Sequence, residues 1–170
     1  MKRKLSRILT VGLAAVISLA AVQAEDYTDN GKAVIFKCNA DGSLEFLKAV
    51  DTGVQPDMIL FADNSTILTA DEGEPREGYG EGTTDPKGSV AVINLDKDTS
   101  AVVDFTSFDE KRDELTDKNV VLKKNKLPSA DLEPEYIAVS GGTAYVTLQE
   151  ANSVAILDIE SKSFTGIYSV

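Results

Sequence analysis

The sequence predicts an all-β protein built from tandem four-stranded antiparallel sheets. Short apolar segments rich in β-branched and aromatic residues recur along the chain, Gly, Asn and Asp turns separate them, and one stretch is repeated at a fixed offset. Histidine is absent and Cys38 is the only cysteine. This excludes an internal disulfide, a His-based triad and a His-ligated zinc. We expect Cys38 to be buried as a small apolar residue, with intermolecular pairing as the rarer alternative.

Residues 1–24 predict a secretory signal peptide. A basic start precedes the uncharged apolar run from Ile8 to Val22, and Val22-Gln23-Ala24 is a small-x-small cleavage site. The alternative is a membrane anchor, but this run of 15 residues is shorter than the roughly 20 that a spanning helix needs. We expect residues 25–170 to form one incomplete domain without a further membrane span, secreted, periplasmic or at the cell surface.

The mature chain is strongly acidic. The leader carries four of the 17 basic residues and none of the 28 acidic residues, so the net charge of residues 25–170 is −15. Such a surface repels phosphate backbones and anionic lipids. We therefore expect no nucleic-acid binding, and divalent cations or basic partners are favoured.

The repeat aligns "QPDMILFADNSTILTADEGE" from Gln55 with "EPEYIAVSGGTAYVTLQEAN" from Glu133, without a gap, at an offset of 78. In this alignment Asp63-Asn64 meets Gly141-Gly142. Both pairs tolerate the positive φ values of two-residue hairpin turns, so we predict the same hairpin in both copies.

Further matches give each unit four strands. "GSVAVINLD" from Gly88 resembles "NSVAILDIE" from Asn152, and a partial copy begins at Gly31. Tandem four-stranded units are typical of β-propeller blades, and the aligned repeat favours this fold over the alternative, a β-sandwich. We predict a partial propeller of about two and a half blades, with blade parts at 31–50, 56–106 and 134–170. Open blade edges would permit self-association, and a truncated product without independent function is a further possibility.

A short helix is predicted within the inter-blade insertion, residues 107–131. Ser107-Phe-Asp-Glu110 fits a capping box, and Phe108, Lys111, Arg112 and Leu115 follow at helical spacing. We expect the helix near Phe108 to Lys118 to be a solvated cover over the blade edge rather than a binding helix.

Strand alternation places two long connections, Gly73 to Gly88 and residues 107–131, on one rim of the blades together with the repeated acids. Carboxylates and glycine turns without histidine suit a hard cation such as calcium, although the EF-hand spacing is absent. The alternatives are a solvated acidic loop or a salt bridge from Arg76 to Glu72 or Glu150. The candidate metal ligands are Asp57, Asp71, Glu72, Glu74, Asp85, Glu135 and Glu150.

Catalysis has less support in the sequence. Metal-dependent phosphoester hydrolysis needs clustered cations that hold phosphate and activate water. The basic residues expected on this rim are few, Arg76, Lys87 and Arg112, and the sequence offers no convincing nucleophile. We therefore expect a binding or scaffold role rather than an enzyme.

The segments "ADEGEPREGY...DPKGSVAVINL" and "DLEPEYIAVSGGTAYVTLQEANSVAILDI" resemble the choice-of-anchor I family, over about Gly31 to Val170. The family comprises secreted or surface-attached β-propeller proteins, some described as mesenchyme-specific cell surface glycoproteins and some labelled alkaline phosphatases. The resemblance implies an exported scaffold that binds a protein or cell-surface ligand, or alternatively part of a calcium-dependent phosphoesterase. Asp71 and Lys87 depart from the family pattern, where Asn and an acid are expected.

Overall fold

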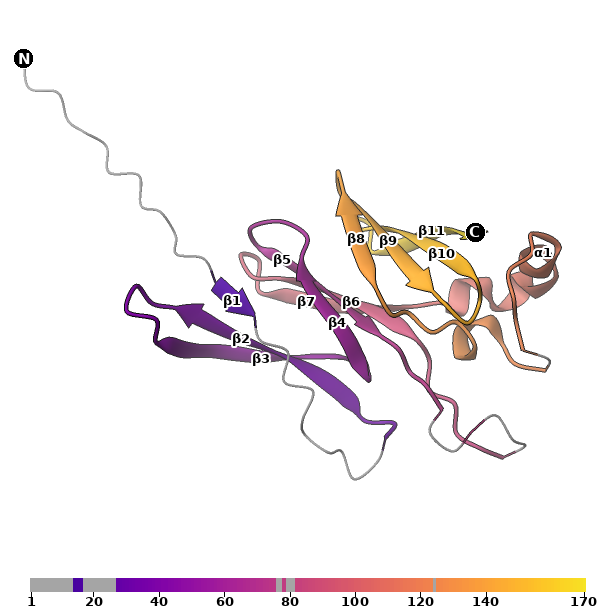
Figure 1. Cartoon of the computed structure of the whole chain (residues 1–170), viewed down its shortest axis with the longest axis horizontal. Coiled ribbons are helices and arrows are strands. Elements are labelled where there is room, and N and C mark those ends of the chain that lie inside the picture. Colours follow the sequence, from indigo (N-terminus) through magenta and orange to yellow (C-terminus); the bar gives the residue numbers. More distant parts are fainter. Residues whose placement is uncertain (1–13, 17–26, 76–77, 79–81, 124) are drawn as a thin grey trace, which may run out of the picture.

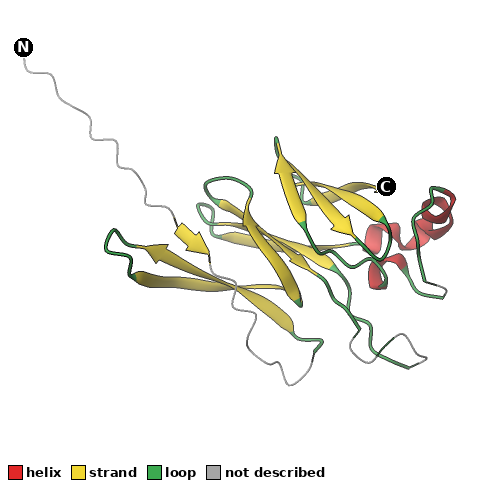
Figure 2. Ribbon diagram, viewed as in Figure 1, coloured by secondary structure: helices red, strands yellow, loops and turns green. Residues whose placement is uncertain are grey.

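The computed structural model describes residues 14–16, 27–75, 78, 82–123 and 125–170, and the account below is confined to them. Its strands form three antiparallel sheets that follow one another as layers, with one short α-helix beside the last (Figures 1 and 2). The first sheet has the order β1-β2-β3, with bounds Ala14–Val16, Asn30–Cys38 and Leu44–Val54.

The second and third sheets each consist of four consecutive strands paired in chain order. The second contains β4 (Pro56–Phe61), β5 (Thr66–Asp71), β6 (Ser89–Asn94) and β7 (Thr99–Asp104). The third contains β8 (Ile137–Ser140), β9 (Thr143–Leu148), β10 (Ser153–Asp158) and β11 (Ser163–Ser169). The all-β class and the four-stranded antiparallel units are thus confirmed. The described strands close no barrel, and the partial propeller stays a prediction.

The last hairpins of the two four-stranded sheets have the same turn. Asn94 Oδ1 and Asp158 Oδ1 each accept a hydrogen bond from the backbone N–H three residues later, at 2.8 and 2.7 Å. Asp98 and Lys162 then adopt positive φ values of 51° and 53°. A side-chain oxygen that mimics a backbone turn explains why Asn and Asp occupy the ends of β6 and β10.

The first hairpins differ, contrary to the prediction. Gly141 and Gly142 form the expected two-residue turn, with φ values of 58° and 84°. Between β4 and β5, however, Ala62 N–H donates to Thr66 O at 2.8 Å, which leaves three residues in the loop. Asp63 Oδ1 stabilises this longer loop by accepting hydrogen bonds from backbone N–H groups that follow it, including Thr66 N–H at 2.7 Å.

The additional loop residue shifts the equivalence of the two sheets. Ile59 pairs with Thr69 across β4 and β5, and Ile137 pairs with Val146 across β8 and β9. Ile59 and Ile137 are equivalent in the repeat, so Thr69 corresponds to Val146 and not to Thr147. The gap-free alignment is therefore out of register by one residue from the second strand onward. The error matters because a one-residue slip moves every side chain to the other face of the sheet.

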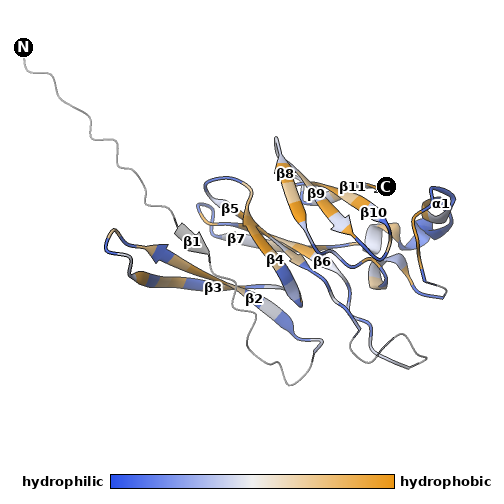
Figure 3. Ribbon diagram, in the orientation of Figure 1, coloured by the Kyte–Doolittle hydropathy of each residue, from blue (hydrophilic) through white to orange (hydrophobic). Residues whose placement is uncertain are grey.

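Apolar side chains fill both spaces between the sheets. Ala33 and Ile35 of β2 pack with Ile67 and Ile93 of the second sheet. The larger cluster joins the second and third sheets through Leu68, Ala70, Val90, Val92, Ala144, Val146, Leu148, Ala155 and Leu157. Figure 3 shows hydrophobic residues concentrated on these strands and hydrophilic residues on the connecting loops and α1.

The insertion forms the predicted helix in a different way from that expected. A 3-10 helix, Thr106–Lys111, leads into α1 (Arg112–Asp117), and a second 3-10 turn covers Pro128–Ala130. The capping box is wrong: the N-cap is Phe105, without a side-chain hydrogen bond. Phe108 and Leu115 are buried in the main core, so the insertion covers core surface rather than lying loosely over it.

Cys38 is exposed at the end of β2, so its expected burial is wrong. The residue is the last of β2 and lies beside the β2–β3 loop. No helix among the described residues is long and apolar enough to cross a membrane. Of the predicted leader only β1 is described, paired with β2 from Ile35 to Lys37, and the remaining residues of the leader lie outside the described part of the chain.

Candidate functional site

Carboxylates from both four-stranded sheets meet at one end of the molecule. Asp57 lies in β4, Glu72 directly follows β5, Glu135 precedes β8 and Glu150 follows β9. Neighbouring antiparallel strands alternate in direction, so these positions share one end of the sheets. Each group is close enough to another to affect its ionisation. We call the set the acidic rim: Asp57, Glu72, Glu74, Glu133, Glu135 and Glu150.

Glu135 and Glu150 are hydrogen-bonded to each other within the acidic rim. Burial, followed by a hydrogen bond with the Glu150 carboxyl and repulsion from Glu150, Glu72 and Asp57, raises the pKa of Glu135 to about 7. The backbone of Glu135 is fixed, because its N–H donates to Thr147 O at 3.1 Å. The Glu135 carboxyl is therefore largely protonated below about pH 7.

Glu72 brings the second sheet to the same place. Burial, together with repulsion from the carboxylates of Glu74, Asp57 and other rim residues, raises the pKa of Glu72 to about 7. Its N–H donates to Gln55 O at 2.9 Å, and the Gln55 amide also holds the backbone of Glu74 by two hydrogen bonds, at 2.9 and 3.0 Å. The connection from Gly73 to Gly88, called the acidic loop below, is therefore held at its start by the junction between β3 and β4.

Asp71 is separated from the rim, although the sequence grouped it with the candidate ligands. Its carboxylate is fully buried and accepts hydrogen bonds from Thr69 Oγ1 at 2.7 Å, Gly53 N–H at 2.9 Å and Ser89 Oγ at 3.0 Å. Burial raises the pKa of Asp71 to about 6 despite these donors. Asp71 thus joins β3 to β5 and β6 inside the protein.

Asp85 also has a local partner. Its Oδ2 lies 2.8 Å from Lys126 Nζ, and the Asp85 side chain is only 6% exposed. Nearby, Lys123 Nζ contacts Glu133 Oε1 at 3.0 Å and Asp131 Oδ1 at 3.3 Å. These ion pairs fasten the insertion to the acidic loop and to the start of the third sheet.

Sequence reasoning missed Glu133, Lys123 and Lys126. Glu133 is only 4% exposed, and its burial raises its pKa while Lys123 opposes the rise. The local sequence does not distinguish a buried glutamate from a solvated one, and both lysines lie in an irregular segment. The two lysines reach their acidic partners because the insertion folds back toward the start of the third sheet.

The described carboxylates do not form a ready-made metal cage. Within the described ranges, no group of three or more acidic or sulfur side chains is placed to hold an ion. Arg76, which was expected to pair with Glu72 or Glu150, lies outside the described residues. A cation at the acidic rim would therefore require the carboxylates to draw together.

Two basic residues considered for phosphate binding have structural partners. Lys87 Nζ lies 3.0 Å from Thr106 Oγ1 and 3.5 Å from Asp104 Oδ2, at the end of β7. The Arg112 guanidinium donates to two backbone carbonyls, Lys123 O and Lys126 O, each at 2.5 Å. Lys87 thus links the loop before β6 to the end of β7, and Arg112 joins two parts of the insertion.

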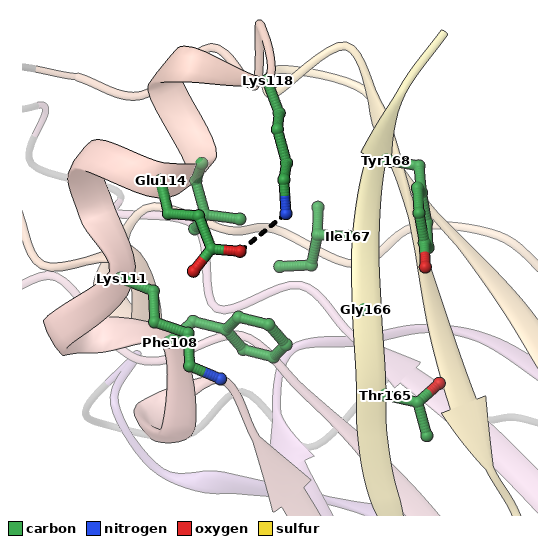
Figure 4. Close-up of a pocket in the computed structure, with 9 residues that line it drawn as sticks. Phe108, Lys111, Glu114, Lys118, Thr165, Gly166, Ile167 and Tyr168 are labelled. Atoms are coloured by element: carbon green, nitrogen blue, oxygen red, sulfur yellow. Dashed lines mark hydrogen bonds and ion pairs between the residues drawn. The ribbon is translucent and has the colours of Figure 1, made fainter.

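A small hollow of 120 Å³ lies between α1 and β11 (Figure 4). Its two lysines are engaged locally: Lys118 Nζ is 2.6 Å from Glu114 Oε1, and Lys111 Nζ lies 5.0 Å from the centre of the Phe108 ring. Ile167 points toward α1 and Tyr168 points away from it. With its charges already paired, the hollow is a weaker candidate site than the acidic rim.

Comparison with known proteins identifies the group to which this fold belongs. Residues 10–170 match the choice-of-anchor I domain, a stretch that includes both four-stranded sheets and the insertion. No curated protein is similar enough to the chain to count as a relative. The domain match indicates a secreted or cell-surface protein and confirms the resemblance carried by the two sequence segments. The chain belongs to the choice-of-anchor I family.

Proposed function

We propose that the protein is an exported binding or scaffold module at the cell surface, and that its acidic rim binds a cation, with calcium as the first candidate. The three sheets are, in this proposal, successive parts of a β-propeller. The identical strand order of the second and third sheets and their identical last turns support that reading.

One observation carries the proposal. Glu72 and Glu135 come from different sheets, yet the pKa of each is raised to about 7 by burial and by neighbouring acids. Carboxylates crowded in this way repel one another when ionised, and a bound cation would remove that cost. Within the acidic rim, Glu133 has a basic partner in Lys123.

The residue types suit calcium. Calcium takes about 6–8 oxygen ligands in flexible geometry, from carboxylates, backbone carbonyls and water. Asp57, Glu72, Glu135 and Glu150 would supply carboxylate oxygens from both sheets. Binding would therefore clamp the second sheet to the third and release protons near neutral pH, because the ligands must ionise.

Calorimetric titration with calcium tests this function. The expected result is a saturable heat, an affinity that rises between about pH 6 and about pH 8 as the rim carboxyls ionise, and a higher melting temperature. The double variant Glu72→Gln plus Glu135→Gln should lose the response. Glu160→Gln is the matched control, because it removes a carboxylate from the turn at the other end of the third sheet.

Two results would contradict the proposal. One is a folded protein that gives neither heat nor thermal shift with millimolar calcium. The other is an equal loss of binding in Glu160→Gln, because general screening of the acidic surface would then explain the response.

A further inference from the structure

The acidic loop and the insertion meet at a buried contact between a lysine and an aspartate. Lys126 Nζ lies 2.8 Å from Asp85 Oδ2, and the side chains of Lys126 and Asp85 are 21% and 6% exposed. Over the described part of the chain, neither carboxyl oxygen of Asp85 has a hydrogen-bond partner. The amine therefore lies next to the carboxyl without the geometry of a hydrogen bond, and burial of the unsatisfied oxygens costs free energy.

The backbone holds both groups of this contact in place. The Arg112 guanidinium donates a hydrogen bond to Lys126 O at 2.5 Å. On the other side, an added Cβ at Gly88 would lie 2.1 Å from Leu132 O, so the acidic loop ends in close packing on the segment that follows the insertion. Because Asp85 and Lys126 are held side by side, a reaction between them avoids most of the entropy that free partners would lose.

A third buried group, Glu133, lies near the contact. Its side chain is 4% exposed, and its Oε1 accepts a hydrogen bond from Lys123 Nζ at 3.0 Å. Burial raises the pKa of Glu133 against the opposing effect of Lys123, and the Asp85 carboxylate adds to the rise. Glu133 is therefore close enough to Asp85 to affect it, and it keeps a proton to a higher pH than an exposed glutamate does, which suits a group that transfers protons.

We propose that Lys126 and Asp85 become joined by an intramolecular isopeptide bond, with Glu133 transferring the protons. Lys126 Nζ forms a bond to Asp85 Cγ, and one C–O bond of the carboxyl breaks. Two of the three ammonium protons pass through the Glu133 carboxyl to the departing oxygen, which leaves as water. The ammonium and the carboxylate are thus converted to a neutral amide and one water, and the step needs no oxidant or cofactor.

A covalent link accounts for this contact better than an ion pair does. In the pair Lys48–Asp98 the aspartate is 84% exposed, and its oxygen accepts a hydrogen bond from the amine. The Asp85 carboxyl has neither the water nor the hydrogen bonds, and a neutral amide removes the cost of burying that charge. The bond would also close a ring of chain in a secreted or cell-surface protein whose single cysteine excludes an internal disulfide.

The intact mass of the exported, folded protein tests the proposal. It should be lower than the mass calculated for its own N-terminus by one water, about 18 Da. Digestion should give a branched peptide that contains both Asp85 and Lys126. Lys126→Arg keeps the positive charge but has no primary amine, and Glu133→Gln cannot carry the protons, so both variants should show the full mass. Lys48→Arg is the matched control at the exposed pair and should still lose the water.

Asp85→Asn gives a second signature at the same position. An asparagine side chain would acylate the lysine with loss of ammonia, so this variant should be about 17 Da lighter than its calculated mass. Cyclisation of Asp85 onto the following backbone cannot cause the loss of water, because the next residue is Pro86, which has no N–H. Should Lys126→Arg fail to fold, Lys126→Met removes the same amine.

A folded wild-type protein of full mass overturns the proposal. It is equally overturned by a loss of water that persists in Lys126→Arg, because cyclisation of an N-terminal glutamate or of another aspartate would then account for the change. If Glu133→Gln forms the bond as fast as the wild type does, the role of Glu133 in the proton transfer is overturned.

Discussion

Among single residues, Asp71 combines a structural role with an unfavourable charge. Its three hydrogen-bond donors come from β3, β5 and β6, so the carboxyl locks the end of the first sheet onto the second. Burial nevertheless disfavours ionisation, and the pKa is raised from 3.8 to about 6. The folded protein therefore binds the Asp71 proton more tightly than the unfolded chain does.

This difference predicts that stability falls as pH rises. The contribution of Asp71 is fully present below about pH 4 and is lost between about pH 4 and about pH 6, at a cost of about 3 kcal/mol. Asp71→Asn cannot ionise, so its free energy of unfolding should vary less over this range. Urea unfolding of both proteins at several pH values measures the difference.

The comparison uses the slope with pH rather than the absolute stability, because Asn also has one acceptor oxygen fewer. Parallel pH profiles for the two proteins would contradict the raised pKa of Asp71. The rim groups Glu72 and Glu135 remain in both proteins, so their titration cancels.

Residue roles were only partly predictable from the sequence. The repeat correctly brought Asp57, Glu72, Glu135 and Glu150 to one end of the sheets, because alternation of strand direction follows from chain order. It gave no means to separate Asp71, which occupies the last position of β5 and points inward, from Glu72, one residue later at the rim. Which of two neighbouring residues is buried depends on packing between the sheets.

At the scale of elements, the insertion is held by one side chain more than by its own helix. The α-helix spans six residues, Arg112–Asp117, too few to be stable alone. Arg112 bridges it to the returning segment through the carbonyls of Lys123 and Lys126. A planar guanidinium can reach both acceptors at once, and an ammonium cannot do so in the same geometry.

Arg112→Lys should therefore loosen the insertion while the sheets stay intact. Amide hydrogen exchange in residues 119–127 is expected to speed up by about tenfold, through local opening. Lys97→Gln, in the turn after β6, is the control and should leave this exchange unchanged. Unaltered exchange in Arg112→Lys would show that the buried Phe108 and Leu115 suffice to hold the segment.

The elements themselves were largely predictable, and the exceptions have a physical cause. Gly141-Gly142 requires positive φ and makes the expected turn. Asp63-Asn64 is equally compatible with such a turn, but the Asp63 carboxylate satisfies the backbone of a longer loop instead. Local propensity permits both conformations, and the pairing of β4 with β5 selects one.

At the scale of the whole molecule, β1 belongs both to the predicted leader and to the first sheet. Ala14–Val16 lie inside the predicted signal peptide, yet they pair with β2 at Ile35, Phe36 and Lys37. Removal of residues 1–24 would leave that edge of β2 without β1.

Processing is therefore expected to change the protection of β2. N-terminal sequencing of the exported protein should begin at Glu25, and the amides of residues 35–37 should exchange faster than in an uncleaved Ala24→Phe variant, whose bulky residue blocks the small-residue site. A mature chain that starts elsewhere contradicts the predicted cleavage. Equal exchange in the two proteins would mean that β1 gives β2 no protection.

Consecutive strand pairing also has a consequence for the timing of folding. Every hairpin of the second and third sheets closes between chain neighbours, so each sheet can form as soon as its own segment is free, on the microsecond scale of hairpin closure. The slow steps are then those that join distant segments, above all the packing of the third sheet on the second. A chain that emerges gradually during export can thus assemble layer by layer, with each finished sheet serving as the template for the next.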